Sequence, residues 1–285
     1  MRELPKPLDQ LSVWSAIPPK LDFVLPGLIT GTVGALVSPG GTGKSMFGLE
    51  LAIGIAGGPD FMRLGFAESG KVLYLAAEDP EPVISTRLHA LGQFISSETK
   101  AEVAANLDVI PAVSAGVDFA AQGDEWVGKL SQAAMGYRLI VIDTLSRVHS
   151  GDENDRQSAA HVMRHLEKLA VTSNAAVLYL HHTSKSAAQN GQGASQQAAR
   201  GSSVWVDESR WTAFLRGMDE REAKQAGVSE TDRANYVRYG VSKNNYGPPE
   251  PDKWLMRHTN GVLVPALFKH KAPKGKPHSR GDDDW

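Results

Sequence analysis

The sequence contains no cysteine. This excludes a disulfide framework, a thiolate nucleophile and a cysteine-based metal site, and it favours a reducing, cytoplasmic location. No apolar run approaches the ~18 residues that a membrane-spanning helix needs, and residues 1–11 lack the apolar centre of a secretion signal. An excess of one charge is also missing, because 30 Lys and Arg stand against 32 Asp and Glu. A chain that coats duplex DNA is usually basic, so any nucleic-acid site here must be local.

What is present is the composition of an ordinary globular protein. Hydrophobic residues make up 41% of the 285 residues, which suits one large domain, or a core with a small appendage. Short apolar runs alternate with helical stretches, which predicts an α/β fold with a mainly parallel, twisted sheet flanked by helices. The runs expected to form its strands are residues 32–37, 71–75, 107–111, 138–142 and 175–180. Because these runs are continuously apolar, both of their faces should be covered.

Helices are expected at residues 45–56, 80–94, 124–134 and 157–172, the first of them with one apolar face. Residues 211–215, 236–242, 253–257 and 262–267 predict further strands, which we expect to form an antiparallel extension. We therefore expect an N-terminal arm at residues 1–20, the main domain at 21–268 and a disordered tail at 269–285.

The strongest local signal is the segment Ser38-Pro39-Gly40-Gly41-Thr42-Gly43-Lys44-Ser45, which follows an apolar strand and opens a helix. A phosphate-binding P-loop requires this context. Glycines let the backbone from Gly40 to Gly43 curl around a phosphate, so the segment predicts ATP binding. Lys44 is expected to reach the β- and γ-phosphates, and the Ser45 hydroxyl to ligate Mg²⁺. Ser38 replaces the usual first glycine, and the alternative is a glycine-rich turn that happens to precede a helix.

Two predicted strands end in acids. The strand at 138–142 runs into Asp143, which would hold Mg²⁺ through a water at the carboxyl edge of the sheet. The alternative is that Asp143 caps the next turn. The strand at 71–75 leads to Glu78-Asp79-Pro80. A P-loop ATPase needs a polar side chain that orients the attacking water, and Glu78 is the candidate for this role. Asp79 precedes a proline and is expected to cap the following helix.

A pair of histidines, His181 and His182, follows the apolar run at 175–180. A polar side chain at this strand end could contact the γ-phosphate and report its loss to the segment that follows. We assign this sensor role to His182. A structural histidine is one alternative, and a metal-binding pair is disfavoured because adjacent residues on a strand face opposite sides.

Two cations lie beside later strands: Arg210 precedes one, and Lys243 ends another. An arginine donated across a subunit boundary stabilises the charge of a phosphoryl-transfer transition state. We therefore expect Arg210, with Lys243 as a second group, to act on the nucleotide of a neighbouring subunit. The alternative for each is an ordinary surface cation.

Together these segments resemble the RecA-like replicative helicases, and most closely the hexameric RepA replication helicases of IncQ-type plasmids. The resemblance covers residues 21–267 and rests on residues 24–26, 32–41, 74–80, 87–92, 181–182, 200–203 and 241–243. Arg87 falls on a family position without a clear role. The matched site residues are the P-loop Lys44 and Ser45, the catalytic Glu78, the Walker B Asp143, the sensor His182 and the arginine finger Arg210.

The resemblance implies a homohexameric ring that hydrolyses ATP-Mg²⁺ at subunit interfaces. It implies 5′→3′ movement on single-stranded DNA in plasmid replication, with initiator and primase proteins as partners and no membrane. By the same analogy, residues 8–16 would pack on an adjacent subunit.

Loops in the pore of such a ring would contact DNA. The candidates are residues 146–156, with Arg147, and residues 183–200, with Lys185 and Arg200. Neither loop offers an aromatic platform for stacking bases, which suits a motor that must not read sequence. The alternative is two solvated loops. The basic stretch at 269–280 could bind phosphates weakly, and the end at 282–285 could dock a partner.

Two other functions fit the same motifs. One is a RecA-type ATPase that forms filaments on single-stranded DNA, and ring closure would separate it from a helicase. The other is a regulatory ATPase switch that never moves on DNA. DNA-stimulated turnover would separate this switch from both DNA-binding proteins.

Overall fold

A computed structural model describes residues 4, 6–66, 68–152, 155–183 and 203–268. Lys185, Arg200 and the tail at 269–285, which the sequence singled out, lie outside these residues. The helices are α1 (Gln10–Ser15), α2 (Lys44–Ile55), α3 (Glu81–Gly92), α4 (Ser97–Asn106), α5 (Gly123–Ala133), α6 (Arg156–Ser173), α8 (Ser203–Glu208) and α9 (Glu220–Ala226). Short 3₁₀ turns are η1 (Leu145–Arg147), η3 (Arg233–Asn235) and η4 (Thr259–Gly261). The strands are β1 (Phe23–Leu25), β2 (Leu28–Ile29), β3 (Val33–Ser38), β4 (Val72–Ala76), β5 (Leu107–Pro111), β6 (Leu139–Asp143), β7 (Ala176–His182), β8 (Trp211–Gly217), β9 (Tyr236–Asn244), β10 (Lys253–Arg257) and β11 (Leu263–Pro265).

The described strands form one large sheet in the order β11-β10-β9-β8-β3-β7-β6-β4-β5, and β1 pairs separately with β2. From β8 to β5 neighbouring strands run parallel, whereas β9, β10 and β11 are antiparallel. The predicted α/β class is confirmed. The antiparallel C-terminal extension is confirmed as well, and β8 joins it to the parallel strands, because β8 pairs antiparallel with β9 and parallel with β3. The chain between β7 and β8 includes α8, and such a long crossover allows β8 to run parallel to β3.

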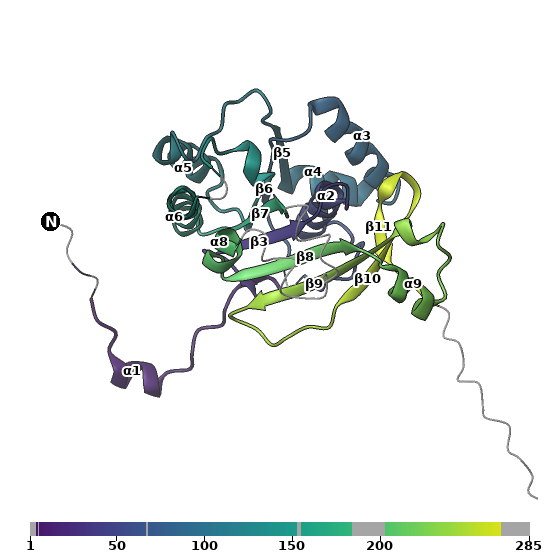
Figure 1. Cartoon of the computed structure of the whole chain (residues 1–285). Helices are drawn as coiled ribbons and strands as arrows, with labels where there is room; N and C mark the ends of the chain where they lie inside the picture. The colour runs from purple at the N-terminus through teal and green to yellow at the C-terminus, as the bar shows by residue number, and fades with distance from the viewer. Residues whose placement is uncertain (1–3, 5, 67, 153–154, 184–202, 269–285) are drawn as a thin grey trace, which may run out of the picture.

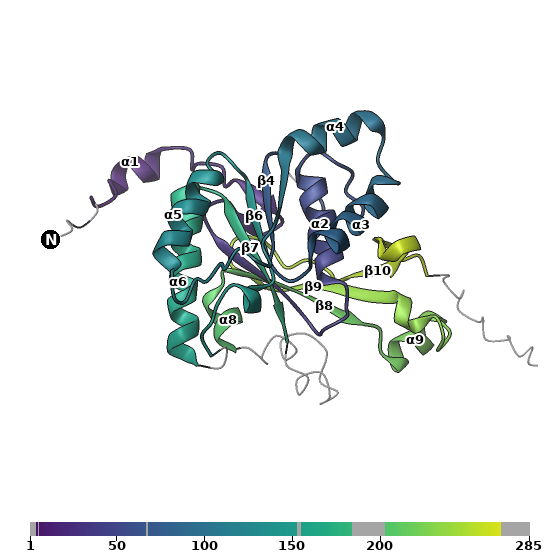
Figure 2. The same ribbon diagram turned by 90° about the horizontal axis from the view of Figure 1, so that it is seen from above.

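Helices cover both faces of the parallel strands (Figures 1 and 2). On one face, α2, α3 and α4 pack over side chains such as Leu36, Val141 and Leu178. On the other face, α5, α6 and α8 pack over side chains such as Val177 and Ile142. The continuous apolar runs of β3, β4, β6 and β7 are buried accordingly. The run of β5 is not, because β5 is the edge strand of the sheet and remains partly exposed.

The burial of the central helix α2 contradicts one prediction. Its sequence indicated one apolar face, yet every residue except Ser45 is buried. The side that would have faced solvent is covered by the C-terminal strands, through Leu255 and Leu263. Helix α4 was not predicted, because Val103 is its only buried residue and the apolar periodicity is weak. Its start is fixed by the Ser96 hydroxyl, which accepts from the Thr99 N–H at 3.2 Å.

The segment that carries α1 projects away from the body (Figure 1). Helix α1 buries no residue, although it and its flanks are rich in apolar side chains. Trp14 is 74% exposed and Ile17 is 95% exposed, and Leu8 and Leu11 are also exposed. The N-terminal arm and its packing on another subunit stay predictions. No helix among the described residues is long and apolar enough to cross a membrane.

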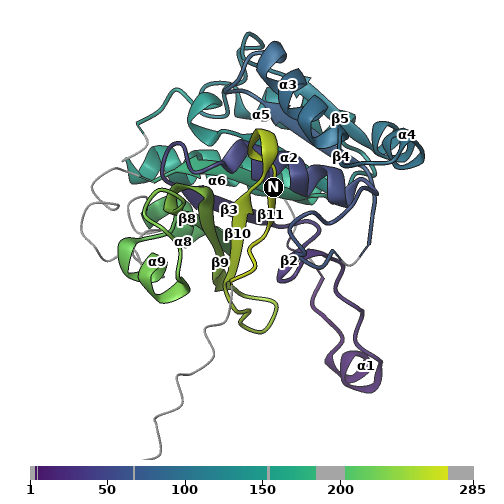
Figure 3. The same ribbon diagram turned by 90° about the vertical axis from the view of Figure 1, so that its right-hand side faces the viewer.

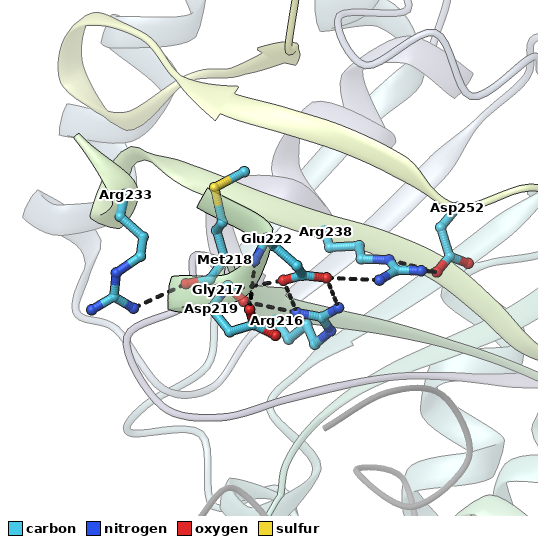
Figure 4. Close-up of polar contacts among 8 residues, drawn as sticks. All are labelled: Arg216, Gly217, Met218, Asp219, Glu222, Arg233, Arg238 and Asp252. Atoms are coloured by element: carbon cyan, nitrogen blue, oxygen red, sulfur yellow. Dashed lines mark hydrogen bonds and ion pairs between the residues drawn. The ribbon is translucent and has the colours of Figure 1, made fainter. Parts of the chain in front are cut away.

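A network of ion pairs joins strands β8 and β9 to helix α9 (Figure 4). Glu222 accepts from Arg216 Nη1 at 2.6 Å and from Arg238 Nη1 at 2.8 Å. Arg238 also donates from Nε to Asp252 at 2.7 Å. These ion pairs, together with the capping box between Asp219 and Glu222, fix α9 at the end of β8.

Candidate nucleotide-binding site

The site forms where four parallel strands end. Ser38 of β3 pairs with His182 of β7, and Asp143 of β6 pairs with Leu180 of β7 and with Ala76 of β4. The carboxyl ends of β3, β7, β6 and β4 therefore meet at one edge of the sheet. Ligands of open α/β sheets bind at this edge.

The segment between β3 and α2 has the backbone of a phosphate cradle. Gly41 has φ of 72° and Gly43 has φ of 103°, a left-handed conformation that glycine adopts without strain. A Cβ at Gly41 would meet no atom within 4 Å, so this part of the loop borders open space. Gly43 is the N-cap of α2 and provides no capping side chain, so the first N–H groups of the helix remain available to an anion. The loop therefore fits the phosphates of a nucleotide.

Lys44 points along the loop toward β7. Its Nζ lies 2.9 Å from Nδ1 of His182 and 3.5 Å from the Ser38 carbonyl oxygen. Lys44 is 5% exposed. Burial lowers the pKa of Lys44 to about 8, although the negative charges of Glu78 and Asp143 act to raise it. The ammonium group can only donate, so His182 accepts at Nδ1 and carries its proton on Nε2.

His182 continues this chain to Glu78. The Nε2 atom lies 3.4 Å from the Glu78 carboxylate, and the two side chains are 36% and 29% exposed. His181 faces the other way, is buried, and lies 5.9 Å from Trp205 between ring centroids. Burial lowers the pKa of His181 to about 4, so it is neutral at pH 7. The described residues contain no group of three or more His, Asp or Glu that could hold a metal, and the two histidines do not converge.

Asp143 lies buried beside Tyr74, whose hydroxyl donates to Oδ2 at 2.7 Å. The second oxygen, Oδ1, is buried without a hydrogen bond. Burial raises the pKa of Asp143, while the hydroxyls of Tyr74 and Ser45 lower it. A buried carboxylate oxygen lacking a partner, next to the Ser45 hydroxyl, fits a hard divalent cation such as Mg²⁺. The alternative role as a turn cap does not hold, because Thr144 is the N-cap of η1.

Glu78 is placed by the backbone and by an ion pair next to it. The N–H groups of Ala77 and Glu78 both donate to the Asp143 carbonyl, at 2.6 and 3.1 Å. Asp79 does not cap α3 as predicted, since Pro80 is the N-cap and no side chain caps it. Asp79 instead accepts from Arg87 Nη1 at 2.5 Å, because Arg87 lies farther along α3 and offers a charge. Arg87 thus fixes the residue that follows Glu78.

Arg210 and Lys243 lie together, away from this edge. Trp211, which follows Arg210, pairs with Gly34 near the start of β3, and Lys243 pairs with Thr212. The Arg210 side chain is exposed and makes no hydrogen bond or ion pair with a described residue, whereas Lys243 donates to the Asp207 carbonyl at 2.8 Å. Four residues of strand, roughly 13 Å, separate Gly34 from the strand end at Ser38. Neither cation therefore belongs to the phosphate loop of its own chain.

Two more cations lie on segments that follow or contact this edge of the sheet. Arg147, the candidate DNA contact, is exposed at the end of η1. Arg257 was not predicted from the sequence, although it donates to the loop carbonyls of Gly41 and Thr42. The only sequence signal was a cation at the end of a strand.

Comparisons with known proteins agree with this architecture. The solved structure described as "ATPase Domain of G40P" matches with a TM-score of 0.58 and 17% identity, covering 84% of this chain and 86% of that one. One described as "The Structure Of A DnaB-Like Replicative Helicase And Its Interactions With Primase" matches at 0.58 and 16%, covering 82% of this chain and 57% of that one. The RadB recombinase matches at 0.51 and 14%, covering 85% and 93%. At these identities the matches show a shared RecA-like fold.

A family model described as "AAA domain" matches residues 3–188. The protein therefore belongs to this AAA domain family, AAA_25.

Proposed function

We propose that this protein is an ATP hydrolase whose site is completed by a second copy and which works as a DNA helicase. The observation that carries the proposal is the chain of contacts from Lys44 through His182 to Glu78, beside the loop and Asp143. A cation for phosphate, a carboxylate for water and a buried acid for the metal converge at one sheet edge. Phosphoryl transfer requires this combination.

Each residue has a definite task in hydrolysis. The loop N–H groups and Lys44 Nζ bind the phosphates. The Ser45 hydroxyl and the Asp143 carboxylate, the latter through a water, would hold Mg²⁺, which would supply positive charge to the phosphates. Glu78 orients the attacking water and accepts hydrogen bonds from it. His182 touches both Lys44 and Glu78, so it is placed to sense the γ-phosphate.

The arrangement of cations supports a homo-oligomer. Arg210 lies just before β8, at the end of the parallel strands that is away from the loop. Its side chain is exposed and unpaired among the described residues, and there it would meet the nucleotide of an adjacent copy. Lys243, one strand away, would join it. The exposed apolar arm around Trp14 and Ile17 offers a second contact between copies. We infer a hexameric ring from the resemblance to hexameric replicative helicases.

The finer assignments rest on that resemblance. We propose 5′→3′ movement on single-stranded DNA in the replication of a plasmid, in the cytoplasm, with initiator and primase proteins as partners. One similar solved structure is a replicative helicase studied with primase. Arg147 is the described candidate for contact with DNA, because it is exposed just beyond Asp143. Lys185 and Arg200 remain sequence-based candidates.

Unwinding of a forked duplex with ATP-Mg²⁺, run beside Lys44→Ala, tests the proposal. Strand displacement by the wild type alone supports a helicase, and the placement of the single-stranded tail gives its direction. DNA-stimulated hydrolysis with no displacement and open polymers in electron micrographs would favour the filament-forming ATPase. Hydrolysis that DNA does not change would favour a regulatory switch.

A further inference from the structure

The phosphate loop is held from behind by a side chain distant in sequence. Arg257, the last residue of β10, donates from Nη2 to the carbonyl of Thr42 at 2.7 Å and to that of Gly41 at 3.4 Å. Its Nη1 donates to the Ala234 carbonyl in η3. One guanidinium thus joins the loop to the turn before β9.

Strand alternation explains how Arg257 reaches the loop. Side chains two residues apart on a strand share a face, so Lys253, Leu255 and Arg257 point to the same side of β10. Leu255 is buried in the core against α2, and β10 and β11 lie beside that helix (Figure 3). Lys253 donates to the Arg63 carbonyl at 2.7 Å, in the segment after α2. The two cations of this face therefore bind the segments on either side of α2.

A third polar contact joins the hairpin to the middle of the helix. Glu50 of α2 accepts from the Leu263 N–H of β11 at 2.7 Å. The hairpin β10–β11 is therefore bound to the loop before α2, to α2 itself and to the segment after it. Of these three contacts, only that of Arg257 reaches the loop itself.

The planarity of the peptide gives the contact of Arg257 a consequence for phosphate binding. In a trans peptide, C=O and N–H point in opposite directions. The Gly41 carbonyl shares a peptide with the Thr42 N–H, and the Thr42 carbonyl shares one with the Gly43 N–H. By holding both carbonyls behind the loop, Arg257 turns both N–H groups to the opposite side, where a phosphate would lie.

The charge of Arg257 points to the same ligand. The side chain is partly buried and forms no ion pair with a described residue. Burial lowers the pKa of Arg257 from its ordinary value. A partly desolvated cation without a counter-ion is unfavourable, and an anion bound in the loop would relieve that cost.

We propose that Arg257 is a positioning residue of the nucleotide site, which orients the Thr42 and Gly43 N–H groups toward the β-phosphate of ATP or ADP and adds a positive charge behind the loop. This inference rests on the nucleotide site proposed above. It predicts a role in affinity rather than in the chemical step, because Arg257 acts through the loop and not on the attacking water.

The test compares Arg257→Met with Lys253→Met in the full-length protein. Both variants lose a cation of the same strand face that binds a backbone carbonyl, but only Arg257 contacts the loop. We expect Arg257→Met to raise the Kd of fluorescent ATP and ADP analogues, and the KM for ATP, by about tenfold or more. We expect kcat at saturation to stay within about threefold, and Lys253→Met to bind within about twofold of wild type.

Arg257→Lys keeps the charge but loses the planar fork, so its Kd should fall between those of the wild type and Arg257→Met. If Arg257→Met does not fold, a Kd for Arg257→Lys equal to that of the wild type overturns the inference. Folded Arg257→Met that binds ATP as tightly as the wild type also overturns it, and leaves the nucleotide site intact. A wild type that binds no ATP would defeat the nucleotide site itself.

Discussion

Lys44 and His182 share a hydrogen bond of 2.9 Å between Nζ and Nδ1, across the gap between α2 and the end of β7. The ammonium group has three N–H donors, and His182 and the Ser38 carbonyl accept two of them, so one donor remains for a phosphate. The side chain that would bind phosphate is therefore in direct contact with the side chain that would sense it, and His182 in turn faces Glu78 through Nε2.

The titration of Lys44 predicts how ATP affinity depends on pH. Its pKa is lowered from 10.5 to about 8 by burial, so the free protein loses this charge as pH rises through 8. Phosphate binds only the charged form, and the Kd for ATP should rise by up to about tenfold per pH unit above pH 8. Titration with a fluorescent ATP analogue from pH 7 to 9.5 measures this.

Lys44→Arg is the control, because arginine stays charged throughout this range. Its affinity should be weaker than that of the wild type but flat with pH. An equal pH dependence in both proteins would show that another group causes it.

The ion pair between Asp79 and Arg87 predicts a loss of turnover without a loss of binding. Both residues lie outside the phosphate loop, but their contact at 2.5 Å fixes the chain immediately after Glu78. Arg87→Met should lower kcat by about tenfold and change the KM for ATP little, because a small displacement of the base impairs the chemical step. Asp79→Asn should do the same. In a double-mutant cycle the two losses should not add, and full additivity would show that the residues act separately.

The local parts of the fold and site were predictable, and the long-range parts were not. The P-loop and the acids at strand ends could be predicted because each depends on a short segment and on the rule that parallel strands end at one edge. The partner of Asp79 could not, because a carboxylate before a proline fits a helix cap equally well. The contact of Arg257 with Thr42 joins residues 215 positions apart. Nothing in a strand ending with a cation says which loop that cation will meet.

The same limit explains the error at α2 and the unpredicted parallel pairing of β8 with β3. An amphipathic reading of α2 was reasonable from its sequence, but the β10–β11 hairpin covers the remaining face. The direction of β8 depends on the crossover before it rather than on its own residues.

Buried Glu50 predicts that stability falls as pH rises. Burial raises its pKa from 4.5 to about 8. Between these values the folded state binds more protons than the unfolded state, so the free energy of unfolding decreases from pH 4.5 to 8. Glu50→Gln keeps an acceptor for the Leu263 N–H and cannot ionise. It should match the wild type at pH 5 and exceed it at pH 9 by an amount on the order of a few kcal/mol.

Urea denaturation at both pH values measures this difference. The exposed Glu81 on α3 is a matched position, and Glu81→Gln should change little at either pH. An advantage of Glu50→Gln that is the same at pH 5 and pH 9 would mean that Glu50 does not titrate as its burial predicts.

The position of Arg210 predicts that two inactive proteins recover activity when mixed. Arg210→Ala should bind ATP but not turn it over, because the transition state loses a charge from the adjacent copy, and Glu78→Gln should be inactive because it lacks the base. Where an Arg210→Ala copy supplies the loop and a Glu78→Gln copy supplies the arginine, the shared site is wild type. In random equimolar assemblies this holds for about a quarter of the interfaces. ATP hydrolysis by the mixture should therefore reach a clear fraction of the wild-type rate, while each variant alone stays near zero. An arginine acting within its own chain would restore nothing on mixing, since every copy would then carry its own defect.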